Sequence, residues 1–514
     1  MADNDQYKWG VVLVACLAIF IIVLDTSAMN VAITTLVVEL NTTLSEIQGI
    51  IALYALIIAS FMLLGSKLQD IMGRKKTFLI GLGIYVIGTI IATLSTSATM
   101  LLIGWAIFEG IGAALIFPAT TTLVGSSYEG KDKITAFSIW GGVAAMGAAI
   151  GPIIGGVFTT YLTWRLVFGS EILIVVIIFL FRHYLSESTP TLQWKDLDIL
   201  GAVLSIISLV LIVTGILFLS DPMNWGNVAV LLISGLILFA VFLLWQRRRI
   251  NKNSQPLIDI SLLKNRLFGL GTINSVIQQI PLAGFLFIIP VFLQQVIKLN
   301  AFNTGFALLP ASITILVVAI VGARLSTIID SKYVVMIGFL VSAAGMIILA
   351  PVFNVNTQIP DIIPGSIVFG VGIGLLMSQL TNLAMSAARA DQETDASGLF
   401  NSFKNLGYSI GTALIGVFLI VGMFWGISAG IASTGQAGNL TNEEIQSSVV
   451  FSYFEKMQTG APPEVSPQLQ PYTTEIINSS ISSAMKQSFY AMALIMILGF
   501  ITSIFIPKRE EPNP

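Results

Sequence analysis

The chain of 514 residues is 55% hydrophobic and only 10% charged, with a mean hydropathy of +0.89. These values exclude an ordinary soluble domain, in which about 25% of residues are charged. A net charge of −2 offers no basic surface for nucleic acid, and a single cysteine, Cys16, excludes an internal disulfide framework. One histidine, His183, gives no basis for a metal site. The composition therefore predicts an all-α integral membrane protein.

Apolar runs of about twenty residues recur along the chain, each long enough for a helix to cross a hydrocarbon core about 30 Å thick. The first run contains Asp25, within "IFIIVLDTSAMNVAI", and no small-residue cleavage pattern follows it, so we interpret it as a retained helix. Polar breaks define fourteen predicted transmembrane helices, at 10–38, 47–66, 77–96, 99–122, 134–158, 165–183, 198–219, 227–245, 268–296, 303–323, 333–353, 361–386, 398–425 and 485–506.

Lys and Arg residues favour one set of alternate segments. With a cytoplasmic N-terminus, the cytoplasmic segments hold most of the 25, Lys404 among them, and the exceptions are Arg165, Lys298, Lys456 and Lys486. Because basic loops stay inside, this bias predicts a multi-pass protein of the cell membrane with both termini cytoplasmic. The polar loop 428–484 would then lie outside, together with the N-x-S/T sequons at Asn41, Asn439 and Asn478.

A faint internal repeat predicts the domain organisation. The segment "LGSKLQDIMGRKK" (64–76) aligns without gaps with "VGARLSTIIDSKY" (321–333), and each follows the second helix of its half. The repeat predicts two six-helix bundles related by an axis along the membrane normal. We expect an N-terminal bundle at 1–190, two inserted helices and a linker at 191–266, and a C-terminal bundle with the outer loop at 267–514.

A carboxylate in the first apolar run needs an explanation. Inserting a charged side chain near the bilayer centre costs about 2.5 kcal/mol or more, so Asp25 predicts a functional site. The alternative is a structural hydrogen bond to Thr26, to Asn30 or to a neighbouring helix.

Two further acids, Glu109 and Glu171, fall in the fourth and sixth predicted helices. Trp105 precedes Glu109 by one turn, so the ring and the carboxylate could together receive an organic cation. The alternative for this pair is plain packing and hydrogen bonding between helices. For Glu171, near the outer end of its helix, the alternative is a snorkelling side chain paired with Arg165.

The loop "SKLQDIMGRKK" has the features of a helix end, a tight glycine turn and a basic segment at a membrane surface. It also resembles the loop motif of the major facilitator superfamily, G-x-L-x-D-x-x-G-R-K. The matching residues are Leu68, Asp70, Gly73, Arg74 and Lys75, while Ser66 occupies the place of the first glycine. The resemblance implies that Asp70 and Arg74 help to hold the cytoplasmic ends of the two bundles together.

The fifth predicted helix contains "GAAIGPIIGG" (147–156), in which glycines spaced by four residues form one helix face that another backbone can approach closely. Pro152 also removes one helical hydrogen bond. The segment resembles the g-x-x-x-G-P-x-x-G-G pattern of exporters in the same superfamily. The matching residues are Gly147, Gly151, Pro152, Gly155 and Gly156. The resemblance implies an antiporter whose motif supports the change between inward-open and outward-open states.

Most of the chain outside 428–484 resembles the fourteen-helix drug:proton antiporter branch, which includes quaternary-ammonium and multidrug exporters. "VLDTSAMNVAI" resembles its first-helix motif, with Asp25 and Asn30 in register. Three positions depart from the branch: Ala106 replaces an arginine assigned to proton coupling, Glu109 a glutamine and Glu171 an asparagine. Whether Glu109 compensates for the missing arginine is open at this point.

The resemblance implies a secondary active exporter of amphipathic, cationic compounds, driven by proton influx through alternating access. A carboxyl group can carry a proton and a cation in turn, so the site candidates are Asp25, Trp105, Glu109, Glu171 and Asn30. We expect a monomer in the lipid bilayer that needs no cofactor besides the proton gradient. A proton-coupled importer or a specialised metabolite exporter is the alternative with the same fold. A membrane-embedded enzyme or sensor is more remote, because the sequence has no metal-ligand cluster, P-loop or nucleophile–base pair.

Overall fold

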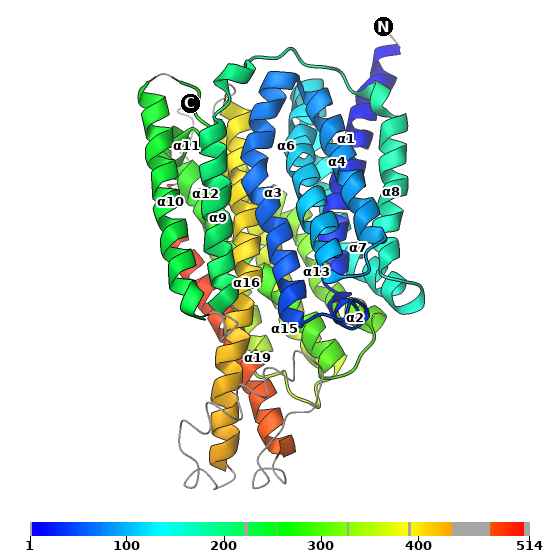
Figure 1. Cartoon of the computed structure of the whole chain (residues 1–514), viewed down its shortest axis with the longest axis vertical. Coiled ribbons are helices and arrows are strands. Elements are labelled where there is room, and N and C mark those ends of the chain that lie inside the picture. The colour runs from blue at the N-terminus through cyan, green and yellow to red at the C-terminus, as the bar shows by residue number, and fades with distance from the viewer. Residues whose placement is uncertain are drawn as a thin grey trace.

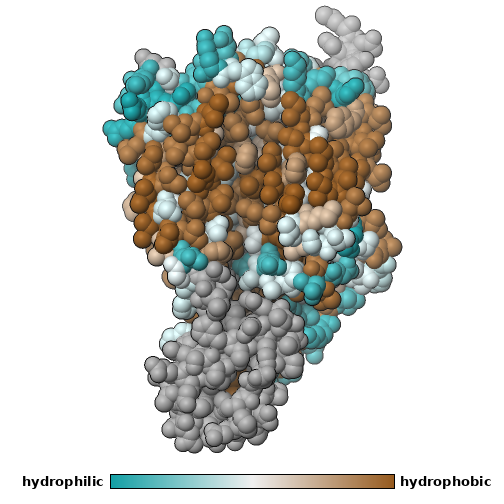
Figure 2. Space-filling model, viewed as in Figure 1, coloured by the Kyte–Doolittle hydropathy of each residue, from teal (hydrophilic) through white to brown (hydrophobic). Residues whose placement is uncertain are grey.

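The computed structural model describes residues 3–219, 225–252, 254–325, 328–388, 392–433 and 473–507. Within these ranges every regular element is a helix, and the long helices run side by side along the long axis of the molecule (Figure 1). The all-α fold predicted from composition is confirmed. Apolar side chains form a broad band around the middle of the visible face, with hydrophilic residues above and below it (Figure 2).

The long helices follow the fourteen predicted runs, one for each. They are α1 (Asp3–Met29), α3 (Leu44–Met72), α4 (Arg74–Thr93), the π-helix η1 (Leu102–Glu109) continued by α6 (Gly110–Ser127), α7 (Gly130–Tyr161), α8 (Arg165–Leu180), α9 (Ile199–Leu219), α10 (Trp225–Asn251), α12 (Arg266–Gln295), α13 (Ala301–Leu325), α14 (Ser331–Leu349), α15 (Ile359–Ser386), α16 (Glu393–Ser433) and α19 (Thr473–Ser503). Short elements connect them: α2 (Ile33–Glu39), α5 (Ala98–Leu101), α11 (Ile260–Lys264), and the 3₁₀ turns η2 (Arg182–Tyr184) and η3 (Trp194–Asp196).

Thirteen of the described helices are long and apolar enough to cross a membrane. The long helix outside that set is α8, whose 16 residues span only about 24 Å at the rise of an α-helix. The predicted run 165–183 was therefore too long, because the chain turns at Phe181 into the short helix η2. Most of the predicted outer loop 428–484 lies outside the described residues, and so does the sequon at Asn439. Of the other sequons, Asn41 lies between α2 and α3, and Asn478 lies within α19.

The single helix predicted at 10–38 is wrong, because the chain breaks between α1 and α2. The side-chain amide of Asn30 donates to the carbonyl of Thr26 at 2.8 Å, and the next amides close tight turns onto Ala28 and Met29. Short polar side chains that bond to nearby backbone compete with helix continuation. The break frees the carbonyl of Val31, which accepts a hydrogen bond from the side chain of Gln294 in α12.

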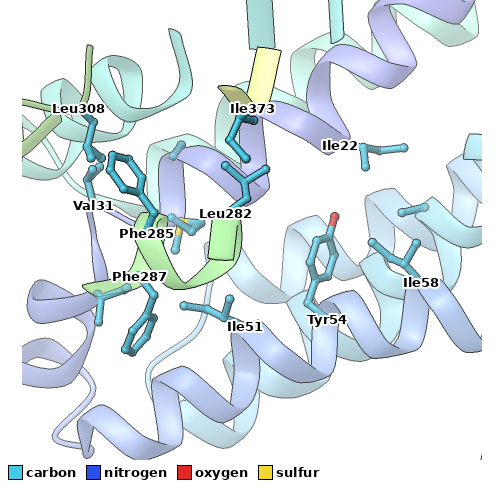
Figure 3. Packing of buried hydrophobic residues seen from close by; sticks show 14 of the residues in the cluster. Ile22, Val31, Ile51, Tyr54, Ile58, Leu282, Phe285, Phe287, Leu308 and Ile373 are labelled. Atoms are coloured by element: carbon cyan, nitrogen blue, oxygen red, sulfur yellow. The ribbon is translucent and has the colours of Figure 1, made fainter. Parts of the chain in front are cut away.

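The helices form two groups and an added pair. We call α1, α3, α4, η1/α6, α7 and α8 the N-terminal bundle, and α12 to α16 with α19 the C-terminal bundle, because these sets pack mainly among themselves. Helices α9 and α10 pack on each other, and α9 also packs against α3 and α16. One hydrophobic cluster spans both bundles, from Ile22 and Tyr54 to Leu282, Phe285 and Ile373 (Figure 3).

The glycines of α7 place that helix against both bundles. A Cβ added at Gly151 would lie 1.9 Å from the hydroxyl of Ser27, and one at Gly155 would lie 2.4 Å from the carbonyl of Ala28. On another side of α7, a Cβ at Gly156 would lie 2.7 Å from the carbonyl of Ala301 in α13. Small residues are therefore required where α7 contacts α1 and where it contacts the C-terminal bundle.

The turn between α3 and α4 has the geometry expected of a glycine. Gly73 adopts a φ of 94°, in the left-handed region, and a Cβ there would lie 2.2 Å from the carboxylate of Glu187. The following side chains, Arg74 and Lys75, donate to the carbonyls of Thr122 (3.3 Å) and Leu185 (2.7 Å). These bonds hold the turn to its own bundle and to the segment that follows α8.

An ion pair joins the bundles at the same end of the molecule as Gly73. The ammonium of Lys67 in α3 lies 2.8 Å from both carboxylate oxygens of Asp395 in α16. Asp70 interacts electrostatically with both of these groups. At this end of the molecule the ion pair between the bundles is made by Lys67, one turn before Asp70, and the connecting role expected of Asp70 and Arg74 stays a prediction.

Substituting the crowded glycine of α7 should weaken the packing of α1. Gly155→Ala should destabilise the protein by about 1–3 kcal/mol, because its methyl group has only backbone atoms to displace. Gly141→Ala is the matched control, since nothing lies within 4 Å of a Cβ there. Thermal unfolding of the purified protein in detergent measures both variants. Equal shifts in the two midpoints would contradict the packing described for α7.

Candidate functional site

The three acids singled out from the sequence lie inside one bundle. Asp25 of α1, Glu109 at the end of η1 and Glu171 of α8 are each 0% exposed. They also interact electrostatically with one another. Burying several carboxyl groups together is costly, because like charges repel strongly where water is absent. A fold that keeps all three needs either a proton or a cation to offset their charge.

Asp25 forms a hydrogen bond with a neighbouring helix. The indole N–H of Trp105 donates to Oδ2 of Asp25 at 2.5 Å. The other oxygen, Oδ1, has no partner among the described residues. The alternative predicted for Asp25 is therefore correct for one of its two oxygens, and the partner is neither Thr26 nor Asn30. The Thr26 hydroxyl donates to the carbonyl of Ile22 instead.

Glu171 is held by a tyrosine that the sequence analysis did not single out. The hydroxyl of Tyr85 in α4 donates to Oε2 of Glu171 at 2.8 Å. The predicted pairing of Glu171 with Arg165 is wrong, because Arg165 binds Glu39 at 2.8 Å near the α2 end of the bundle. The signal for this contact was the tyrosine itself, since a phenol buried in an apolar helix usually finds a hydrogen-bond partner.

Glu109 has two free oxygens: neither Oε1 nor Oε2 has a hydrogen-bond partner in the described part of the chain. It ends the π-helical segment η1, in which the amide of Gly110 bonds to the carbonyl of Trp105, five residues back. Such segments are rare and occur frequently at functional sites. Gly88 of α4 permits the close packing here, because a Cβ on it would lie 2.6 Å from the amide nitrogen of Glu109.

Aromatic rings enclose the bond between Asp25 and Trp105. The ring of Tyr54 lies 5.4 Å from that of Trp105, and the ring of Phe168 lies 5.9 Å away on an edge-to-face approach. Tyr54 projects from α3 with its hydroxyl directed away from its own helix (Figure 3). Rings on this scale exclude water, which strengthens the electrostatic interactions inside them. Trp105 is thus fully engaged within the N-terminal bundle, with Asp25 and not Glu109 as its hydrogen-bond partner.

Asn30 lies at the junction of the two bundles instead of beside Asp25. Its side-chain amide donates to the hydroxyl of Tyr408 in α16 at 3.2 Å. One residue further on, the freed carbonyl of Val31 accepts from the amide of Gln294 in α12 at 2.8 Å, and the hydroxyl of Thr34 bonds to the same glutamine. The end of α1 is therefore attached to the C-terminal bundle, while Asp25 on the same helix faces its own bundle.

Comparisons with known proteins agree with this architecture. The sequence model described as Major Facilitator Superfamily matches residues 15–412. The chain is 26% identical over 417 residues to the riboflavin transporter RibZ of Clostridioides difficile, covering 80% of this chain and 88% of that protein. It is 26% identical over 407 residues to the multidrug resistance protein Stp of Mycobacterium tuberculosis, covering 78% and 74%. It is 29% identical over 413 residues to the cephamycin export protein CmcT of Amycolatopsis lactamdurans, covering 78% and 83%.

Solved structures share the fold at low sequence identity. A bacterial homologue of the human lysosomal transporter Spinster, in an inward-facing and unoccupied conformation, superposes with a TM-score of 0.61 at 12% identity, covering 97% of this chain and 98% of that one. The crystal structure of tetrameric PepTSo2 gives a TM-score of 0.60 at 17% identity, covering 97% of each chain. At these identities the similarity establishes the fold alone.

The bond between Asp25 and Trp105 should appear as a coupling free energy. Trp105→Phe leaves a buried carboxyl oxygen without its donor, which costs about 1–3 kcal/mol, and the cost should shrink in a background of Asp25→Asn. Thermal unfolding in detergent of both single variants and of the double variant measures the coupling.

The matched control combines Asp25→Asn with Trp245→Phe. Trp245 of α10 donates to Asp198 at 2.9 Å in the added pair of helices, so its effect should simply add to that of Asp25→Asn. Strict additivity for Trp105 as well would contradict a direct bond to Asp25.

Proposed function

The chain belongs to the Major Facilitator Superfamily, and we propose that it exports amphipathic compounds across the cell membrane in exchange for protons. The observation that carries the proposal is the set of three buried carboxyl groups in the N-terminal bundle, with both oxygens of Glu109 free. Ionisable groups enclosed in a membrane bundle commonly serve proton relays. The names of Stp and CmcT, a resistance protein and an export protein, favour export over import.

In the proposed mechanism, Glu109 and Asp25 carry the exchanged protons. A proton on an oxygen of Glu109 removes one negative charge from the cluster and so relieves its repulsion with Asp25 and Glu171. Trp105 keeps Asp25 in place through its N–H, and Tyr85 does the same for Glu171. Loss of the proton restores the repulsion, which favours a rearrangement of the helices that hold the three acids.

The end of α1 transmits this rearrangement to the C-terminal bundle. Asp25 lies less than two turns from Asn30, whose partner is Tyr408, and from Val31, whose partner is Gln294. If a change in the charge of Asp25 shifts α1, both contacts would therefore be strained or released. Rocking of one bundle against the other exposes a site between them to each side of the membrane in turn.

The predicted preference for lipophilic cations is an alternative use of the same cluster. A cation near the free oxygens of Glu109 would offset the carboxylate charge as a proton does. We assign the cluster to protons because the indole of Trp105 already binds Asp25, and both side chains are enclosed in one bundle. Transport of a metabolite is the second candidate function, since the relative RibZ is named a riboflavin transporter.

Several finer expectations remain proposals. We retain the fourteen-helix drug:proton antiporter branch, the cytoplasmic placement of both termini, a monomer, and the proton gradient as the energy source without a further cofactor. An enzyme is not proposed, because the superfamily consists of transporters.

Transport by inverted membrane vesicles with an acidic interior tests the exchange. Native protein should accumulate ethidium, tetraphenylphosphonium or a rhodamine dye, and uptake should stop when the pH gradient is collapsed. Asp25→Asn and Glu109→Gln should each lower the initial rate at least tenfold, since a neutral amide carries no exchangeable proton of this kind.

Glu39→Gln is the matched control for the vesicle experiment. Glu39 is an acid at the end of the short helix α2 that pairs with Arg165 of the N-terminal bundle at a partly exposed site, so its loss should change the rate by less than twofold. Native rates in both carboxyl variants would contradict the assignment of the proton to these residues. Absence of gradient-dependent movement of all the probes by native protein would contradict the proposed export.

A further inference from the structure

A lysine lies inside a membrane span of the C-terminal bundle. Lys404 follows the start of α16 by eleven residues and falls within the candidate span Asp395–Ile427. From the sequence alone, Lys404 counts among the basic residues of the cytoplasmic segments, although the predicted helix 398–425 contains it. A charged side chain within a span is costly and marks a functional position by default.

The contacts of α16 fix the direction in which Lys404 faces. Ser397 precedes it by seven residues, or two helical turns, and the hydroxyl of Ser397 lies 3.5 Å from that of Thr121 in α6. Tyr408 follows it by one turn and bonds to Asn30 of α1. Both partners belong to the N-terminal bundle. Since the three residues lie along one line of the helix, Lys404 faces the N-terminal bundle between these two contacts.

Another face of α16 holds the helix in this orientation. The hydroxyl of Ser402 donates to the carbonyl of Ala59, and that of Ser409 donates to the carbonyl of Ala52 at 2.6 Å. Both acceptors are backbone groups of α3. Rotation of α16 that turned Lys404 away from its position would break these bonds.

Lys404 has no counter-charge in the described part of the chain. Its side chain is half-buried and makes no ion pair or hydrogen bond with any described residue. Asp25 precedes Asn30 by five residues and so lies about 140° around α1 from the residue that meets α16. Asp25 is also bonded to Trp105, and Glu109 lies enclosed in the bundle behind it. The nearby acids therefore face away from Lys404.

The face of α1 that meets α16 at Asn30 carries no charged residue among its described neighbours Val23 and Thr26. Val23 and Thr26 share the face of α1 that carries Asn30, and both are half-buried. On the side of Lys404, Asn401 uses its side-chain amide to bond the carbonyl of Ser397 at 3.0 Å. A cationic group on α16 and an uncharged surface on α1 fit a molecule that has an anionic end and an uncharged body.

We propose that Lys404 binds an anionic oxygen group, a carboxylate or a sulfonate, of the transported compound as it passes between the two bundles. The proposal rests on the proposed export function and gives it a substrate class: amphipathic acids and zwitterions in preference to the corresponding neutral or cationic esters. Protons and cargo then use different parts of the protein, with the carboxyl cluster in the N-terminal bundle and the cargo anion on α16.

A matched pair of dyes tests the assignment by binding, without transport. The probes are a rhodamine with a free carboxylate and the methyl ester of the same dye, measured by equilibrium dialysis against purified full-length protein in detergent. Native protein and Lys404→Arg should bind the acid about tenfold more tightly than the ester, which corresponds to about 1.4 kcal/mol. Lys404→Gln should lose this preference and keep its affinity for the ester within twofold.

The control variant is Lys486→Gln, which removes an exposed lysine on α19 and should preserve the preference for the acid. The proposal would be overturned if native protein bound the two dyes with equal affinity or bound neither of them. If Lys404→Gln lost affinity for both dyes equally, the proposal would also be overturned, and the result would indicate that the lysine has a partner within the protein. Because dialysis needs no proton gradient, preference without gradient-driven transport would leave the role of Lys404 intact and count against the proposed exchange.

Discussion

The hydrogen bond from Trp105 to Asp25 is the contact around which the N-terminal bundle is arranged. It allows a carboxyl group to lie where no water reaches it, and the rings of Tyr54 and Phe168 close the space around it. Both oxygens of Glu109 are left without a described partner, whereas Tyr85 donates to one of the two oxygens of Glu171. Burying carboxyl groups in this way lowers the free energy of unfolding. The presence of three such acids in one bundle is therefore the strongest physical sign of ion handling in the molecule.

The break at the end of α1 connects this imbalance with the other half of the protein. In a continuous helix the carbonyl of Val31 would accept a hydrogen bond from a backbone amide of the same helix. Because the helix breaks, this carbonyl accepts from the side chain of Gln294 instead. The glycines of α7 add a second junction, since they bring its backbone against α1 and against α13. The buried acids therefore lie on one side of these junctions, and Lys404 of α16 lies on the other.

The sequence predicted the helices well and the contacts poorly, for physical reasons. Apolar runs define spans because the bilayer imposes a fixed length, and the exceptions, the break after Met29 and the short α8, arise from local hydrogen bonding and turns that hydropathy does not register. Asp25, Glu109 and Glu171 were recognisable because a charge in an apolar run is rare. Their partners depend on which helices become neighbours, so neither Tyr85 nor the separation of Glu171 from Arg165 followed from spacing. Lys404 was overlooked because it was counted with the basic residues of the cytoplasmic segments, although it lies inside the predicted helix 398–425.

The measurement that tests the central claim most directly is proton release on cargo binding. Purified protein in weakly buffered detergent would be mixed with the rhodamine carboxylate while a pH indicator is followed, for native protein and for the double variant Asp25→Asn with Glu109→Gln. The account predicts that native protein releases protons as the dye binds, and that the double variant binds the dye without release. No release by native protein, or equal release by both, would contradict a carboxyl cluster that exchanges protons for cargo.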